Sequence, residues 1–181
     1  MKKRSTFVTV SIIAAIGIWS AMTPEKKVLI TEKDPHFIDA YIRDFTLTAM
    51  NEHGKTDYTL KAELMEHYND TGDSDIKHPV FNFIQEDGNW LVSAKRGNID
   101  QTSTWVVLEE DVVMLQQDAE NPVRIRTSQL RFNTKTQIAA TDKPVDIDQG
   151  NSVLKSNGMI FNNSTGKLEL LAGVNGTYVG P

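Results

Sequence analysis

The sequence predicts an all-β fold, an antiparallel β-jelly-roll or β-sandwich built from stacked, repeated hairpins. Apolar and polar residues alternate in short runs such as Phe45/Leu47/Ala49, and a period of two is typical of half-buried strands. Turn-forming residues separate the runs, for example at positions 51–54, 69–75 and 163–166. An internal repeat runs through the same region. These three observations predict the body of the chain, residues 37–181.

The repeat joins a large apolar or aromatic residue before each turn to a valine 12 or 13 positions later. Each first residue is followed by Asn or Asp, and successive units begin 31, 33 and 29 residues apart. The four pairs are Tyr68 and Val80, Ile99 and Val112, Phe132 and Val145, and Phe161 and Val174. A hairpin repeated at this period indicates a stacked architecture.

Two prolines, Pro79 and Pro144, directly precede the closing valine of their units, and the alternation changes parity at both. Proline cannot donate a ladder hydrogen bond, so we expect bulges or edge positions at which the strands bend. Each strand offers one apolar face, which predicts two antiparallel sheets packed face to face.

Stacking in a line leaves an open backbone edge at each end of the jelly-roll. The first edge falls near residues 41–50 and includes Leu47 and Ala49. The last falls within residues 168–178, which carry no charge after Glu169. We expect this uncharged edge to pair with a partner, through Leu170, Ala172, Val174 and Tyr178.

Residues 5–24 contain no charged side chain and have the length of one transmembrane helix. Phe7, Ile12, Ile16 and Trp19 are its main anchoring side chains. A cleaved secretory signal is the alternative, but cleavage after Ala21 places Trp19 at position −3, where a small residue is required. We therefore favour a retained anchor.

Basic residues set the orientation of this anchor, since Lys2, Lys3 and Arg4 precede it and favour a cytoplasmic N-terminus. The predicted organisation is a cytoplasmic tail (1–4), a transmembrane helix (5–24), a linker (25–36) and a periplasmic domain (37–181). This is the topology of a single-pass protein of the inner membrane.

Composition excludes several functional classes. Residues 28–181 hold 14 basic and 23 acidic side chains, a net charge of −9, which disfavours nucleic-acid binding. The chain has no cysteine, so disulfides and thiolate metal sites are impossible. Asp70-Thr71-Gly72 resembles an aspartic-protease triplet but lies in a polar turn, and the four histidines lack metal-ligand spacing. We expect no enzymatic activity, metal or cofactor.

Several strings, together with the short anchor and the repeated hairpins, resemble the LptC family of lipopolysaccharide transport proteins. They are Asp34-Pro35, Gly54 with 58–62, Pro79-Val80, 90–99, 106–112 and 167–174. The resemblance covers essentially the whole chain. It implies a periplasmic β-jelly-roll, open along one side, whose groove holds the acyl chains of lipopolysaccharide.

The resemblance also implies partners and site residues. The anchor and the N-terminal edge would meet the inner-membrane ABC transporter LptBFG, and the C-terminal edge would meet the periplasmic bridge protein LptA. Positions matching the family's lipid path are Phe45, Ile76 and Leu168. Further candidate lipid contacts on the inner face are Phe81, Phe83, Trp90, Leu108 and Phe132.

Two alternatives remain open from the residues alone. By itself, the alternation of apolar and polar residues favours packing of these inner-face side chains in an ordinary hydrophobic core over contact with lipid. A membrane-tethered scaffold that joins two assemblies by strand addition, without carrying lipid, has the same edges. The sequence also leaves open whether free domains pair into a homodimer.

Overall fold

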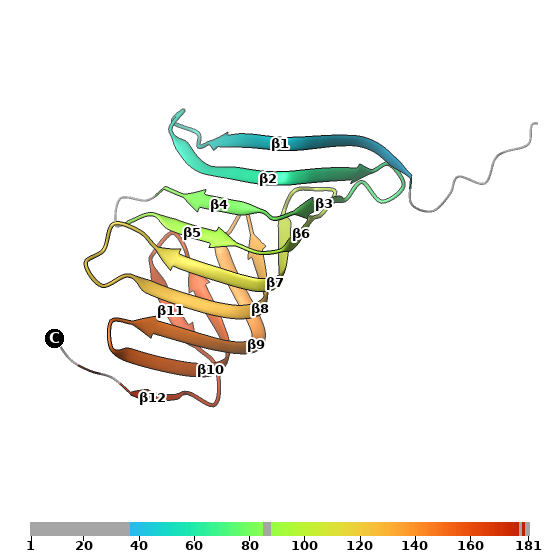
Figure 1. The fold of residues 1–181 in the computed structure, drawn as a ribbon. Coiled ribbons are helices and arrows are strands. Elements are labelled where there is room, and N and C mark those ends of the chain that lie inside the picture. The colour runs from blue at the N-terminus through green and yellow to red at the C-terminus, as the bar shows by residue number, and fades with distance from the viewer. Residues whose placement is uncertain (1–36, 85–87, 178, 180–181) are drawn as a thin grey trace, which may run out of the picture. The chain divides into compact units, whose positions relative to one another are not determined.

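A computed structural model describes residues 37–84, 88–177 and 179, which form twelve antiparallel strands with no helix among them (Figure 1). The strands are β1 (Ile38–Met50), β2 (Thr56–Tyr68), β3 (Ser74–Lys77), β4 (Val80–Phe83), β5 (Trp90–Ser93), β6 (Arg96–Ile99), β7 (Trp105–Gln116), β8 (Val123–Asn133), β9 (Ile138–Gln149), β10 (Ser152–Asn162), β11 (Lys167–Leu170) and β12 (Asn175–Thr177). The predicted all-β antiparallel class is confirmed.

All twelve strands belong to one sheet that folds over on itself, rather than to the two separate sheets expected from the sequence. Long strands bend midway and contribute to both facing halves. β2, for example, pairs with β4 through residues 58–61 and with β3 through residues 64–67. We call these the β4–β5 half and the β3–β6 half. The apolar inner faces of the two halves meet because the strands that carry them are continuous.

The bend crosses neighbouring strands at corresponding positions and is made by irregular backbone. Glu110 and Asp111 in β7 have positive φ angles of 62° and 53°, and the β7–β8 register shifts there. Gly158 in β10 has a φ of 106°, and a Cβ at this position would lie 2.9 Å from the Thr141 carbonyl oxygen. Only glycine fits this close approach without strain.

Both prolines lie on the bend, as predicted. Pro79 separates β3 from β4 and follows His78, whose φ is 50°. Pro144 pairs with Asn157 immediately beside the β9–β10 register shift. Proline lacks the N–H that a regular ladder position needs. At the bend the ladder is already irregular, so the missing donor costs little stability.

The Asn or Asp that follows the first residue of each repeat has a structural reason in three of the four units. Asp100 accepts a hydrogen bond from the Trp105 N–H at 2.7 Å. Asn133 accepts one from the Thr136 N–H at 2.9 Å, and Asn162 one from the Thr165 N–H at 3.1 Å. Side-chain acceptors of this kind hold the backbone of a tight turn. The repeat is therefore a strand end, its turn, and the return strand up to the bend.

Candidate functional site

The space between the two halves is filled by the predicted inner-face residues. Six of the eight candidate lipid contacts are buried in the core: Ile76, Phe81, Phe83, Trp90, Leu108 and Phe132. Phe45 in β1 and Leu168 in β11 are partly buried and pack against the two ends of this core. Together the eight residues form a row that extends from the first strand of the sheet to β11. The structure thus brings the predicted set together along one apolar path.

Aromatic rings join the two halves at strand ends remote from the bend. Phe83 in the β4–β5 half packs against Phe132 in the β3–β6 half, with ring centroids 5.1 Å apart. Trp90 and Phe161 make an equivalent contact, also at 5.1 Å. These distances are those of favourable tilted ring pairs. The two contacts, which we call the aromatic bridges, hold the halves together where no backbone joins them.

Little space remains inside. The apolar cavity lined by the aromatic bridges has a volume of about 20 Å³, close to what one water molecule needs. An acyl chain is far larger, so its entry requires the halves to separate. The aromatic bridges are the contacts that must part for this to happen.

The interior is uncapped at the β1 end. Within the part of the chain that the structure describes, β1 contacts β2 and no other strand, and no residue packs against the outer end of its inner face. Ile42 and Leu47 pair with Met65 and Leu60 on this face, yet they are 47% and 42% exposed. Ala49 is half-buried on the same face. The predicted edge residues Leu47 and Ala49 therefore continue the row begun by Phe45.

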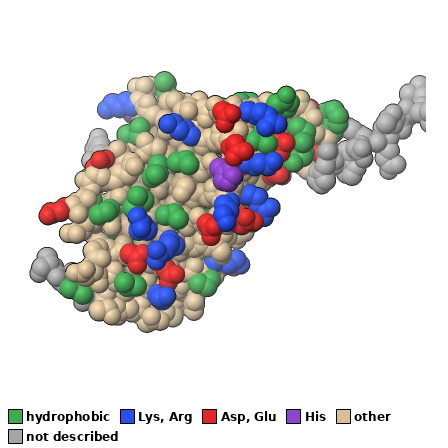
Figure 2. Space-filling view, viewed as in Figure 1, with side chains coloured by type: hydrophobic (Ala, Val, Ile, Leu, Met, Phe, Trp, Pro, Cys, Tyr) green, Lys and Arg blue, Asp and Glu red, His purple; other side chains and the backbone are tan. Residues whose placement is uncertain are grey.

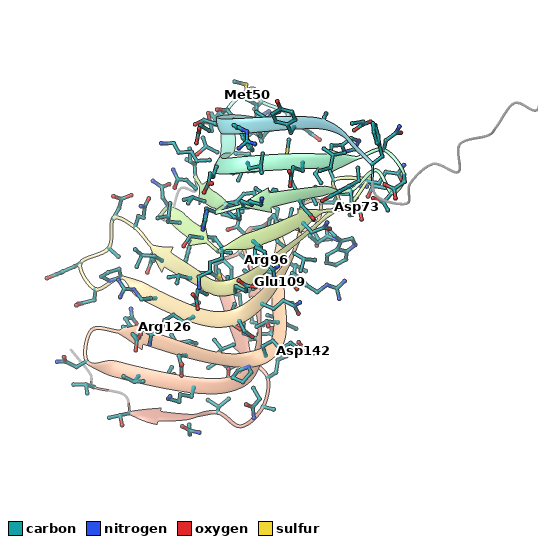
Figure 3. The ribbon with its side chains drawn as sticks, turned by 45° about the vertical axis from the view of Figure 1, so that its right-hand side comes forward. Met50, Asp73, Arg96, Glu109, Arg126 and Asp142 are labelled. Atoms are coloured by element: carbon teal, nitrogen blue, oxygen red, sulfur yellow. The ribbon has the colours of Figure 1, made fainter. Side chains whose placement is uncertain are left out.

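The free edge of β1 is also long. All thirteen residues of the strand pair with β2 on one side or lie within that ladder, and among the described residues the other side pairs with nothing. Figure 3 shows Met50 at the outer end of this hairpin, where it is 67% exposed. A continuous unpaired strand is a template for adding a strand from another chain.

The C-terminal edge is built differently. Two short strands, β11 and β12, cover different stretches of β10. Leu170 in β11 is half-buried against the core, whereas Ala172 and Val174 lie exposed between the two strands. Tyr178 and the predicted anchor residues lie outside the described residues. The edge is therefore open but short and interrupted.

Charged side chains lie along the outer side of the bend. Lys95 pairs with Asp111 at 2.6 Å and Arg96 with Glu110, and these contacts join β6 and the loop before it to the bend in β7. The hydrogen bond from Lys95 to Asp111 raises the pKa of Lys95. In Figure 2 acidic and basic side chains are interleaved on this face. Being paired and exposed, they stabilise the fold only slightly.

Two features were not among the sequence-based site predictions. Phe161 completes the second aromatic bridge, and its place at the start of a repeat, equivalent to Phe132, was the available signal. Tyr41 and Ile42 are exposed neighbours in β1, and adjacent apolar residues in one strand could have indicated a strand exposed on both faces. Within the described residues, no cluster of three metal-ligating side chains and no helix able to cross a bilayer occurs.

The fold is similar to a solved structure of LptH, the LptA-homologous periplasmic component of the lipopolysaccharide transport device of Pseudomonas aeruginosa. The TM-score is 0.53 at 6% identity, over 68% of this chain and 95% of that one, a likeness of fold alone. No curated protein matches the sequence. The family model "Lipopolysaccharide-assembly, LptC-related" matches residues 7–179. The chain therefore belongs to the LptC family.

Proposed function

We propose that this protein is a membrane-anchored component of lipopolysaccharide export. It accepts lipopolysaccharide from the inner-membrane ABC transporter LptBFG and passes it through its interior to the periplasmic bridge protein LptA. Membership of the LptC family supports the role in lipopolysaccharide transport. The observation that carries the route is the apolar row from Phe45 to Leu168, which has an open edge at both ends.

The physical chemistry of the cargo fits this route. Each buried methylene contributes about 0.8 kcal/mol, so several acyl chains between the halves offset the loss of the aromatic bridges. The head group carries phosphates, and the acidic body of the domain would repel them. The head group therefore stays outside while the acyl chains lie between the halves.

The proposed location is the inner membrane, with residues 5–24 as a single anchor, residues 1–4 in the cytoplasm and the β domain in the periplasm. Phe7, Ile12, Ile16 and Trp19 supply the apolar surface of the anchor. Mass spectrometry of the native protein tests the retained anchor, because a mature terminus near Met22 or Thr23 would instead mean signal cleavage. The chain contains no nucleotide-binding motif, so the energy for transport comes from the transporter.

Site-specific photo-crosslinking in cells tests the lipid route. A photoreactive residue at Phe45, Ile76 or Leu168 is expected to form an adduct with lipopolysaccharide. Thr46 and Glu169 are matched controls, because they are exposed neighbours in the same strands. Adducts at the controls and none at the three inner positions would contradict a route through the interior.

A lipid-free scaffold is the second candidate, and the small interior cavity favours it. On this alternative the two edges join neighbouring assemblies and the halves never separate. A short bifunctional thiol reagent that joins Trp90→Cys to Phe161→Cys separates the two cases. Blocked transport with both partners still bound supports the lipid route, whereas unimpaired transport supports the scaffold.

A further inference from the structure

The last strand of the sheet is split into two pieces. β11 pairs with residues 159–162 of β10, and β12 pairs with Val153, Leu154 and Lys155. Residues Leu171–Val174 between them lie outside any strand, and Gly173 has a φ of 59°. Leu171 and Ala172 still bond to the β10 backbone, since the Leu171 N–H donates to the Gly158 carbonyl at 3.1 Å and the Asn157 N–H to the Ala172 carbonyl at 2.7 Å. The break therefore lies at Gly173, between this held segment and β12.

β12 is held weakly. It has only three residues, and all three are exposed. After β12, the Val179 N–H donates to the Ser152 hydroxyl at 2.9 Å, and that hydroxyl lies 3.2 Å from the Val179 carbonyl oxygen. β12 itself buries no side chain, so few contacts oppose its release.

β12 is also unusually close to β10. A Cβ added to Gly176 would lie 2.1 Å from the Val153 carbonyl oxygen and 2.8 Å from the Leu154 Cα, both backbone atoms. No side chain fits there, so the pairing depends on glycine at this position. Opposite Gly176, Leu154 is only partly buried although it packs against the core. β12 therefore leaves the inner side of Leu154 incompletely covered.

The strand beneath is a far better template. β10 has eleven residues, and Ser152, Ser156 and Met159 are buried, so it is fixed in the sheet. A longer incoming strand would extend along β10 on both sides of Leu154. It would also make more ladder hydrogen bonds than the three residues of β12.

We propose that β12 is a removable cover that occupies the edge of β10 until an incoming strand replaces it. The incoming partner is an extended strand of the bridge protein that is longer than β12. This inference rests on the proposed function, since it specifies where the C-terminal partner docks. Until β12 leaves, residues 153–155 of β10 are closed to that partner.

A reversible lock tests the proposal. Val153 and Thr177 are direct partners in the ladder, a spacing suited to a disulfide, and the chain has no other cysteine. In the full-length Val153→Cys/Thr177→Cys protein, oxidation is expected to abolish capture of the bridge protein, and reduction to restore it. The matched control is Ile160→Cys/Glu169→Cys, which locks β11 and leaves β12 free.

Gly176→Val supplies a second measurement that needs no bridge protein. The valine expels β12, so a fluorescent peptide of residues 173–179 is expected to bind this variant about tenfold more tightly than the wild type, whose edge is occupied. The same peptide carrying Gly176→Val should not bind. Thr177→Val, which introduces no clash with β10, is the matched control protein and should behave as the wild type.

The outcomes separate the two proposals. Equal capture by the oxidised and reduced β12-locked protein, or equal peptide binding by Gly176→Val and wild type, overturns the role of β12 and leaves the proposed function standing. Failure of every form, wild type included, to capture the bridge protein overturns the proposed docking. In that case peptide binding still decides whether β12 uncovers β10.

Discussion

Phe83 stands at the end of β4 with three aromatic neighbours. It contacts Phe132 across the interior, and Phe81 and Tyr58 within its own half. Burial in the same contacts raises the pKa of the Tyr58 phenol. The ring therefore contributes to the stability of its own half and also to the contact that closes the interior. A substitution at this position affects both properties.

Phe83→Ala is expected to lower the free energy of unfolding by about 3–5 kcal/mol, because a buried phenyl ring is lost and a cavity remains. Urea denaturation of the full chain in detergent, followed by tryptophan fluorescence, measures this. Leu91→Ala in the adjacent strand is the control, since Leu91 is only half-buried. A similar loss for both variants would contradict the special position of Phe83.

The hydrogen bonds of Asp100 predict how the free energy of unfolding changes in acid. The Thr102 hydroxyl and the Trp105 N–H donate to its carboxylate, and these bonds lower the pKa of Asp100 below the ordinary value of 3.8 for an aspartate. The stabilisation is therefore fully present above pH 3.8 and is lost as pH falls through the lowered folded-state pKa.

Asp100→Ala is expected to lower the free energy of unfolding by about 1 kcal/mol at neutral pH, the usual value of a lost turn hydrogen bond. The difference between variant and wild type should shrink in strong acid, where the carboxyl is protonated in both states. Urea midpoints measured from pH 2 to pH 7 check this. A difference that does not change with pH would mean that the charge of Asp100 is irrelevant.

At the scale of elements, β1 is the only long strand among the described residues that contacts a single neighbour, because β11 and β12, which also contact one strand, have four and three residues. The proposed function assigns the transporter contact to β1, because among the described residues its outer edge is unpaired and Ile42 and Leu47 on its inner face are exposed. Substitutions there should disturb docking while leaving folding intact, because exposed positions contribute little to stability.

Leu47→Asp is expected to abolish co-purification with the transporter and to change the free energy of unfolding by about 0.5 kcal/mol or less. The charge prevents an apolar neighbour from covering the inner face. Thr48→Asp adds the same charge on the opposite face of the same strand and should retain binding. Equal loss in both variants would indicate that charge, and not the covered face, is responsible.

How far the elements could be predicted depended on local chemistry. The turns and bends were predictable, because Asn133, Asn162 and the two prolines act through their own backbone surroundings. The joining of both halves into one sheet was not, since pairings such as that of β3 with β6, which sets Ser74 opposite Ile99, depend on register between strands that are not neighbours in the sequence. The split of the last strand was also missed, although Gly173 and Asn175-Gly176 are residues that typically interrupt a strand.

At the scale of the whole domain, the sequence predicted which residues face the interior, but not how tightly they pack against one another. Alternation identified Phe81, Trp90 and Phe132 as inward-facing, and their burial agrees with that. Alternation could not reveal that rings from the two halves touch, because side chains far apart in the sequence fill the same space. Whether these residues hold lipid is a question for crosslinking, since both core and conduit require the same apolar faces.

The free chain is expected to self-associate through its exposed β1 edge when no transporter is present. Ile42 and Leu47 leave apolar surface uncovered, and a second copy offers the same strand. Sedimentation velocity in detergent should show a concentration-dependent homodimer in the wild type and none in Leu47→Asp. A monomer at every concentration would contradict this edge as a pairing surface.

The uncovered end at β1 makes the lifetime of each copy depend on assembly. A neighbour that covers Ile42 and Leu47 binds only the folded state, so it shifts the unfolding equilibrium by mass action. Copies made in excess of their neighbours would unfold more often and meet proteases sooner. Proteolysis of copies that have no partner would then keep the amount of this protein matched to the amount of its partners, without a dedicated regulator.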